Sequence, residues 1–271
     1  MKALVYAAHD RIEVRDVPEP APGAGEVLVR VAAAGICGSE LEAFATRSPR
    51  RPPPLVMGHE FCGQVAALGP GVQGIQVGDR VVMNSLIACG ACEACREGRA
   101  HLCPRRDVFG MRRPGGFAEL CVVPAATVFH LPEKVSPLEG ALVEPLANAV
   151  HVGTLVQERL PETVVVIDAA GTTETRRDAV GIARPGGEVV WIGLHGDETA
   201  LSGAEVVLGE RRVQGSYAVT ARDLRKAIGL FAHGRVDITP WARPFPLTDG
   251  GRVFRELLSQ PKEYVKAILL P

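Results

Sequence analysis

The first half of the chain, up to about residue 130, is a series of short apolar runs separated by turns. The runs are KALVYA, EVLVRVAAAG, FCGQVAALG, DRVVMNS and FAELCVV, and glycines punctuate the stretch from Gly58 to Gly78. Short apolar runs bounded by turn residues predict β-strands. We therefore expect a tightly turned, mostly antiparallel β domain, in which RSPRRPPPL at 47–55 forms an extended loop.

The pattern changes after Pro137 to alternating helix and strand signals. A helix is predicted through EPLANAVHVGTLVQE, followed by strand VVVID, helix TETRRDAVGIA, turn RPGG and strand EVVWIGL. A strand near RRVQGSY, helix ARDLRKAIGLFAHG, short helix GRVFRELL and closing strand YVKAILL complete the chain. Such alternation predicts a parallel sheet with right-handed crossovers.

Composition and charge narrow the class of partner. The 271 residues are 46% hydrophobic and 23% charged, which is enough for one or two globular domains. Thirty basic residues balance 31 acidic ones, so we expect a small-molecule partner and neither nucleic acid nor membrane. The start MKALVYAAHDRIEVRDV alternates apolar and charged residues, and no later run reaches about 18 apolar residues. We expect a soluble, cytoplasmic protein.

Four of the seven cysteines lie within fifteen residues, in the pattern C-x2-C-x2-C-x7-C. Without an export signal, this spacing favours a metal over disulfides. Four thiolates can close a tetrahedral zinc shell that has no open position, which makes a structural site. The alternatives are an iron–sulfur cluster and four unrelated surface thiols. The residues concerned are Cys89, Cys92, Cys95 and Cys103.

A second group of potential ligands is spread over three motifs. Cys37 lies in AGICGSE, His59 and Glu60 lie in MGHEFCG, and Glu144 lies in LVEPLANAVH, where we expect a helix to begin. One thiolate, one imidazole and one or two carboxylates leave a zinc position for water or substrate, as in catalytic sites. Each residue alone could serve packing or, for Glu144, the first turn of a helix. Only the combination predicts a catalytic zinc.

Several motifs in this order resemble the zinc-dependent medium-chain dehydrogenase/reductase family, nearest to its sorbitol and threonine dehydrogenase branch. They are GHE, the cysteine lobe, GDRV, GGFAE and EPL, and later RPGGEVVWIGL and KAILLP. The resemblance covers residues 1 to about 153 and resumes at Val164. It implies an α/β plus β fold, with a GroES-like, mostly antiparallel β catalytic domain and a truncated Rossmann-like parallel α/β domain. The expected domains are 1–150, with the structural zinc lobe at 86–106, and 151–271, from which the closing strand could return to the catalytic domain.

The resemblance also implies roles for individual residues. Cys37, His59 and either Glu60 or Glu144 would bind a catalytic zinc, while the four clustered cysteines would bind a structural zinc, giving two zinc ions per chain. Ser39 stands where the family has a Ser or Thr that takes the proton from the substrate alcohol, although a serine here could also cap a helix. The family commonly has a histidine where this chain has Glu42. The proton relay is therefore altered or absent, and the candidate acid/base residues are Ser39, Glu42, Glu60 and Glu144.

The strand from Val164 to Asp168 arrives too early for a complete nucleotide-binding domain. Twelve residues separate His151 from Val164, and most of them continue the preceding helix. A βαβ unit takes about 30 residues or more, and no G-x-G-x-x-G fingerprint occurs in the chain. The first half of the family's nucleotide domain is therefore missing. We expect no cofactor-binding residues and no NAD(P) binding.

These observations predict a zinc enzyme that uses the metal as a Lewis acid without a hydride. The expected reactions are elimination, hydration, cyclisation or isomerisation of a hydroxy- or keto-substrate, the work of a lyase or isomerase. The alternatives are an NAD(P)-dependent zinc alcohol or polyol dehydrogenase with a reduced cofactor site, and a non-catalytic zinc-holding scaffold. Strand VVVID would lie at a sheet edge, so we expect the 145–160 helix or another subunit to cover it and the chain to form a homo-oligomer.

Overall fold

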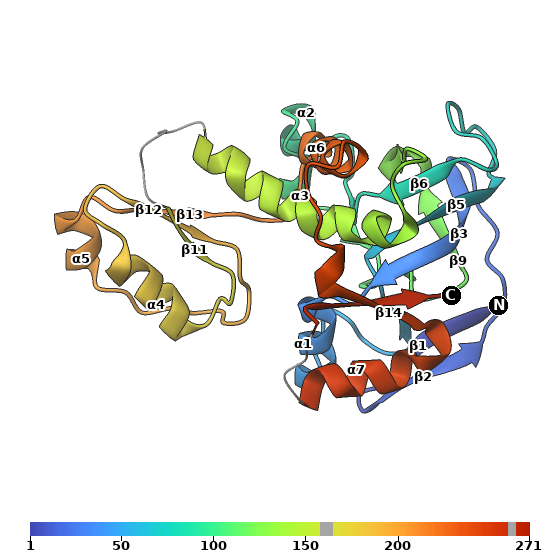
Figure 1. The fold of residues 1–271 in the computed structure, drawn as a ribbon, viewed down its shortest axis with the longest axis horizontal. Helices are drawn as coiled ribbons and strands as arrows, with labels where there is room; N and C mark the ends of the chain where they lie inside the picture. Colours follow the sequence, from blue (N-terminus) through green and yellow to red (C-terminus); the bar gives the residue numbers. More distant parts are fainter. Residues whose placement is uncertain (158–164, 260–263) are drawn as a thin grey trace. The chain divides into compact units, whose positions relative to one another are not determined.

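The computed structural model describes residues 1–157, 165–259 and 264–271 (Figure 1). It divides into two compact units, of which the first joins Met1–Ala147 to Val219–Pro271 and the second comprises Asn148–Ala218. The second unit is thus shorter than the expected range 151–271. The reason is that the chain after Val219 supplies a helix and a strand pair to the core and main sheet of the β domain.

The first unit is built on three sheets. The largest has seven strands, which pair in the order β10-β6-β5-β3-β15-β14, with β9 also paired to β3. All its pairs are antiparallel except β14 with β15, so the expected mostly antiparallel β domain is confirmed. The strands are β3 (Glu26–Gly35), β5 (Glu60–Leu68), β6 (Arg80–Met83), β9 (Leu120–Pro124), β10 (Val128–His130), β14 (Ala242–Pro246) and β15 (Lys266–Leu270).

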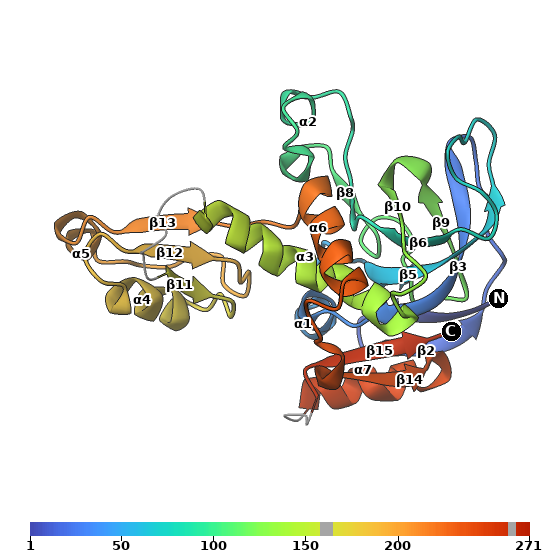
Figure 2. The same cartoon turned by 45° about the horizontal axis from the view of Figure 1, so that its top comes forward.

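Two smaller sheets and several helices complete this unit (Figure 2). One small sheet is β2-β1-β4, and the other is the pair β7-β8. The short strands are β1 (Lys2–Ala8), β2 (Arg11–Asp16), β4 (Leu55–Val56), β7 (Leu86–Ile87) and β8 (Asp107–Val108). The helices are α1 (Gly38–Thr46), α2 (Glu93–Arg96), α6 (Ala221–Ala232) and α7 (Gly250–Ser259), with 3-10 turns η1 (Ala100–Leu102), η2 (Ala125–Thr127), η3 (Thr239–Trp241) and η4 (Leu247–Asp249).

The C-terminal segment is part of the core of the first unit. Phe254 of α7 is fully buried and contacts Phe44 edge to face, and Phe44 in turn contacts Tyr6 of β1. Burying an aromatic side chain contributes about 2 to 3 kcal/mol, so this stack helps to hold α7 and α1 on the sheet. Strand β15 pairs antiparallel with β3, which brings the end of the chain beside Gly35.

Helix α3 (Pro137–Gln157) begins earlier than expected. Ser136 and Glu139 form a reciprocal cap, in which the Ser136 N–H donates to the Glu139 carboxylate at 2.7 Å and the Glu139 N–H donates to Ser136 Oγ at 3.3 Å. With Pro137 as the first helical residue, the sequence SPLE is a capping box that fixes the start. The expected placement of Glu144 at a helix start is therefore wrong, because Glu144 lies two turns inside α3.

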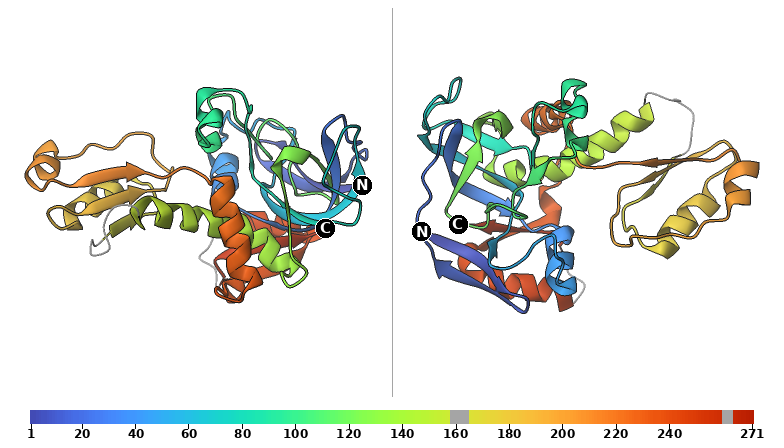
Figure 3. Two further views of the ribbon diagram at one scale, coloured as in Figure 1. Left: turned by 90° about the horizontal axis from the view of Figure 1, so that it is seen from above. Right: turned by 180° about the vertical axis from the view of Figure 1, so that it is seen from behind.

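The second unit is a small parallel sheet with helices, as expected for a truncated Rossmann-like domain (Figure 3). Its strands pair in the order β11 (Val165–Asp168), β12 (Glu188–Trp191) and β13 (Arg212–Gly215). Its core joins Val189 of β12 to apolar residues of α4 (Thr173–Ile182), with α5 (Gly203–Leu208) alongside. Val164, the predicted first residue of β11, lies outside the described residues. Within the described sheet β11 is an edge strand, and Ile167 is 54% exposed. What covers this edge stays a prediction.

In the part of the chain that the structure describes, no helix combines the length and the apolar character needed to cross a membrane.

Candidate active site

The four clustered cysteines converge in space. Their sulfur atoms all lie within 4.8 Å of one another, and none forms a disulfide. The Sγ atoms of Cys92 and Cys95 are 3.4 Å apart, and those of Cys89 and Cys95 are 3.9 Å apart. Four thiolates on one zinc ion, at about 2.3 Å each, would be separated by about 3.8 Å. The sulfur spacing therefore fits a single tetrahedral metal, whereas a four-iron cluster, with one thiolate on each iron, needs wider spacing.

Local hydrogen bonds prepare this lobe for a metal. The N–H of Ala91 is the main cause that lowers the pKa of Cys89 to about 6, and Arg105 donates to Cys89 Sγ at 3.2 Å. Desolvation instead raises the pKa of Cys95 to about 11. Thiolates are the metal-binding form of cysteine, so Cys89 offers a ready ligand and the others ionise as the metal binds.

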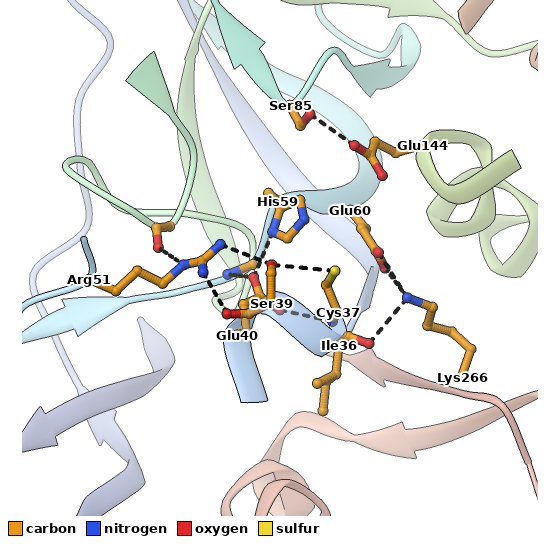
Figure 4. Close-up of polar contacts among 12 residues, drawn as sticks. Ile36, Cys37, Ser39, Glu40, Arg51, His59, Glu60, Ser85, Glu144 and Lys266 are labelled. Atoms are coloured by element: carbon orange, nitrogen blue, oxygen red, sulfur yellow. Dashed lines mark hydrogen bonds and ion pairs between the residues drawn. The ribbon is translucent and has the colours of Figure 1, made fainter. Parts of the chain in front are cut away.

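A second group of ligand atoms forms where β3 ends and β5 begins (Figure 4). Atoms of Cys37, His59 and Glu60 all lie within 4.8 Å of one another. The strand register explains the meeting, because Gly35 pairs with Glu60, so that Cys37 just beyond β3 faces His59 just before β5. Gly35 leaves room for this arrangement, since a Cβ at that position would be 2.3 Å from a carboxylate oxygen of Glu60.

His59 is oriented by Glu40, a fully buried residue of α1. Its Nδ1 lies 2.9 Å from Glu40 Oε1, which also accepts the N–H of Gly58 at 2.9 Å. Burial disfavours the charged imidazole, but the charges of Glu40 and Cys37 outweigh it and hold the pKa of His59 well above its ordinary range. Because Nδ1 is engaged by Glu40, Nε2 is the nitrogen that can face a metal.

Glu60 is held by a lysine from the last strand. Lys266 Nζ donates to both carboxylate oxygens of Glu60 at 2.8 Å and to the carbonyl oxygen of Ile36 at 3.2 Å. Burial would lower the pKa of Lys266, but the Glu60 charge outweighs this effect and raises it. The lysine therefore stays charged and orients Glu60 beside Cys37 and His59.

The remaining candidates lie nearby but in different settings. Glu144 accepts a hydrogen bond from Ser85 Oγ at 3.0 Å, and it is not among the ligand atoms that converge around Cys37 in the described residues. The geometry of this structure favours Glu60 over Glu144 as the carboxylate beside Cys37 and His59, and the identity of the zinc ligand stays a prediction. Among the described residues, the Glu42 side chain has no hydrogen-bond partner. Its role in a proton relay also stays a prediction.

Ser39 is the second residue of α1, and the residue that caps this helix is Cys37. The alternative of a Ser39 helix cap is therefore wrong. Its hydroxyl donates to Cys37 Sγ at 3.4 Å and accepts from Arg51 Nη2 at 3.2 Å. A hydroxyl group thus stands directly beside the ligand group.

The donor chemistry of both groups suits zinc. A thiolate, an imidazole and a carboxylate make an open donor set, whereas four thiolates make a closed one. The fit of a nicotinamide dinucleotide is only partial. The loops after β11 and β12 meet closely, since a Cβ on Gly171 would be 2.3 Å from the Gly193 carbonyl carbon. Ligands bind at such carboxyl ends of parallel strands, but in the described part of the second unit no strand precedes β11, so no strand–turn–helix unit for pyrophosphate stands before it.

Comparison with protein families now adds to this geometry. Residues 23–133 match the model of the alcohol dehydrogenase GroES-like domain, and residues 147–233 match that of the zinc-binding dehydrogenase. Together the two matches cover more than half of the chain. The chain belongs to the zinc-dependent medium-chain dehydrogenase family. The second of these models is described as that of a zinc-binding dehydrogenase, which agrees with the two groups of potential zinc ligands.

Individual relatives agree with the family match. An L-threonine 3-dehydrogenase from Pyrococcus horikoshii is 42% identical over 162 residues, which are 59% of this chain and 46% of that protein. The chain spans about half the length of the curated relatives it matches. A zinc-binding dehydrogenase from Sinorhizobium meliloti 1021, solved with NADP, is 28% identical in sequence and has a TM-score of 0.87. The match covers 100% of this chain and 99% of that protein's chain. An alcohol dehydrogenase from Escherichia coli CFT073, solved with NADH, has a TM-score of 0.92 at 23% identity over 100% of this chain and 99% of its own, which shows a shared fold.

These comparisons correct the expected chemistry. The prediction of a lyase or isomerase without a hydride is wrong, because the named relatives are dehydrogenases and two structural neighbours hold NADP or NADH. The same neighbours count against the expectation that NAD(P) does not bind. The physical reason for the error is that a missing pyrophosphate turn removes one part of a cofactor's binding energy, and it does not define the reaction of the zinc site.

Sequence reasoning missed three residues that build the site. Glu40, Arg51 and Lys266 each contact a candidate ligand or Ser39 directly. Lys266 had a readable signal, since it is the one charge between apolar residues in YVKAILL. Glu40 and Arg51 stand among other charged residues, and nothing in the sequence marks which of these turn inward.

Proposed function

We propose that the chain is an NAD(P)-dependent zinc alcohol or polyol dehydrogenase with a reduced cofactor site. The observation that carries this proposal is the open donor set of Cys37, His59 and Glu60 with the Ser39 hydroxyl hydrogen-bonded to Cys37 Sγ. A scaffold would need only the closed cysteine group. An alcohol oxidation needs a metal with a free position and an adjacent group that accepts the hydroxyl proton; the three-ligand donor set suits the first need and the Ser39 hydroxyl suits the second.

Each residue of the site has a defined task in this proposal. Cys37, His59 and Glu60 would hold a zinc ion, and the Lewis-acid chemistry it would supply is polarisation of the substrate oxygen. Ser39 would accept the proton that leaves the substrate hydroxyl while its own hydroxyl proton turns away from Cys37 Sγ and leaves toward solvent. Glu40 fixes the ring of His59, and Lys266 balances the charge of Glu60. Glu42 is the candidate that carries the proton on to solvent.

A nicotinamide cofactor supplies the hydride acceptor. The second unit offers the glycine loops at the ends of β11 and β12, and Arg176 donates to the carbonyl oxygens of Gly193 and Gly196 at 3.0 and 2.6 Å, which fixes the second loop. Without a pyrophosphate turn in the described residues, we expect weaker cofactor binding than in a dehydrogenase that carries both mononucleotide halves.

The substrate class proposed is a small polar alcohol. The Pyrococcus relative is named for the 3-hydroxyl of threonine, a secondary alcohol next to an amino acid backbone. Threonine and short polyols are therefore the first substrates to test.

We further propose a homo-oligomer, supported by the edge position of β11 in the described sheet. Sedimentation velocity would contradict this proposal by showing a monomer at all concentrations.

The decisive experiment is a hydride-transfer assay on zinc-loaded protein. Threonine and a panel of polyols, each carrying deuterium on the carbinol carbon, are incubated with NAD⁺ or NADP⁺, and the reduced cofactor is analysed by mass spectrometry. We expect transfer of one deuterium to the nicotinamide ring. A Cys37→Ala variant is the control, and it should transfer none. A wild-type protein that reduces neither cofactor with any substrate, and binds neither by calorimetry, would contradict the proposal.

A further inference from the structure

Arg51 is a buried cation at the edge of the candidate active site. It lies in the loop between α1 and β4, and only 4% of its surface is exposed. In the part of the chain that the structure describes, it forms no ion pair with a carboxylate. Its guanidinium donates instead to three neutral oxygens, namely Gly110 O at 3.0 Å, Ser39 O at 2.7 Å and Ser39 Oγ at 3.2 Å (Figure 4). Burying an arginine is costly, so these bonds compensate for lost hydration.

Two of the three bonds end on Ser39, one on its carbonyl oxygen and one on its hydroxyl. The bonds to the carbonyl oxygens of Ser39 and Gly110 would be enough to tie the loop to α1 and to the Gly110 turn. The third bond, to Ser39 Oγ, reaches the side chain of Ser39 and not its backbone. It restricts the rotation of one hydroxyl group, which lies between Arg51 and Cys37 (Figure 4).

Counting donors and acceptors shows the consequence for Ser39. A hydroxyl has one proton and two acceptor sites, whereas a guanidinium can only donate. Arg51 therefore always occupies one acceptor site of Ser39 Oγ, and Cys37 Sγ takes the proton. One acceptor site is left. Without Arg51 the hydroxyl is held by Cys37 Sγ alone, and its acceptor sites can turn away from an incoming alcohol.

We propose that Arg51 is a positioning residue that orients the Ser39 hydroxyl so that its remaining acceptor site faces the substrate alcohol. This inference rests on the proposed dehydrogenase function for its catalytic consequence. Its structural content, the coupling from Arg51 through Ser39 to Cys37, does not depend on that function. A residue that only tied two loops together would affect folding and metal content without depending on Ser39.

The kinetic test uses Arg51→Met, Ser39→Ala and the double variant. Methionine keeps the length of the side chain and removes every donor, and Arg50→Met is the matched control, because Arg50 is exposed and adjacent. We expect kcat for alcohol oxidation to fall about 30-fold in each single variant, with KM unchanged within about twofold. The double variant should be no slower than the slower single variant, since both substitutions remove one device. Independent losses that multiply in the double variant would overturn the proposal.

A spectroscopic test works without turnover. Cobalt(II) replaces zinc, and the spectrum of a Cys37→Ala variant is subtracted to isolate the sulfur-to-cobalt band of Cys37. A hydrogen bond from Ser39 stabilises the sulfur electrons, so Arg51→Met and Ser39→Ala should both shift this band to longer wavelength, with no further shift in the double variant. Arg51→Lys, which keeps a donor and should fold normally, is expected to restore part of the shift.

The two readouts separate the two proposals. If the wild-type protein oxidises no alcohol but the cobalt band shows the coupling, the dehydrogenase proposal fails and the positioning by Arg51 stands. If the protein is active but the Arg51→Met band and kcat equal those of the wild type, the positioning by Arg51 is refuted while the dehydrogenase proposal stands.

Discussion

The two candidate metal-ligand groups of this chain are built in opposite ways. The cysteine group takes all four of its potential ligands from one segment of fifteen residues, and these four would complete a zinc shell without a ligand from another element. The open group takes Cys37 from just beyond β3, His59 from just before β5 and Glu60 from the start of β5. It is held by Glu40 of α1, Lys266 of β15 and the Arg51 loop.

From this difference we expect the closed group to contribute mainly to stability and the open group to carry the reaction. A closed local shell is stabilised by the free energy of metal binding, and it needs few contacts with the rest of the fold. An open shell exposes an unsatisfied metal position, so its ligands must be fixed by surrounding hydrogen bonds before the metal and substrate arrive. Metal removal should therefore disorder the first group and leave the second largely in place.

The largest effect is expected from breaking the closed group. Cys103→Ser should lose one of two zinc ions and lower the free energy of unfolding by about 5 kcal/mol, because the lobe folds around its metal. Metal analysis and urea titration measure both quantities. Cys121→Ala is the control, since Cys121 is a buried thiol outside both groups, and it should keep two zinc ions. Two zinc ions in Cys103→Ser would contradict a closed four-cysteine shell.

Breaking the open group should affect activity more than stability. Cys37→Ala should lose the other zinc ion and lower the rate of alcohol oxidation by about a thousandfold. The free energy of unfolding should change by about 1 kcal/mol or less. Circular dichroism, metal analysis and the deuterium-transfer assay follow the three properties. A Cys37→Ala protein that unfolds like Cys103→Ser would erase the distinction between the two groups.

The ion pair of Lys266 and Glu60 shows how far the open group is held by the protein itself. Lys266→Met leaves the buried Glu60 carboxylate without its partner, which should cost about 3 kcal/mol in metal-free protein. In zinc-loaded protein the same substitution should lower the free energy of unfolding by less, because the metal compensates the carboxylate charge. Denaturant titrations with and without zinc test this, with exposed Lys134→Met as the control. An equal loss in both states would show that Glu60 does not face the metal.

The smallest effect concerns the closed group again. Arg105 is an exposed residue that donates to Cys89 Sγ, so Arg105→Met should speed the release of zinc from the cysteine lobe by a few-fold at most. A colorimetric zinc chelator follows the rate, and Arg112→Met serves as an exposed control. A change of several orders of magnitude would mean that this lobe depends on its surroundings as much as the open site does.

Much of this picture was predictable from short-range patterns. The strands of the β domain, the helix and strand order after Pro137 and the cysteine group follow from residues close together in the sequence. The motifs around Cys37 and His59 were also readable. The start of α3 was readable in principle from SPLE, but the EPL motif drew attention to Glu144. The shortened nucleotide unit was measurable by counting residues, but the reaction inferred from that absence was wrong.

The sequence by itself determined which groups could bind metal, because ligand chemistry belongs to single residues and the cysteine spacing is local. Only the tertiary structure decided what surrounds those groups. The pairing of β3 with β5 and β15 places Lys266 beside Glu60, although 206 positions separate them along the chain. The fold of one loop likewise turns Arg51 inward onto Ser39 while Arg50 next to it stays exposed. Such choices depend on long-range strand register and burial, and they leave no local pattern to read.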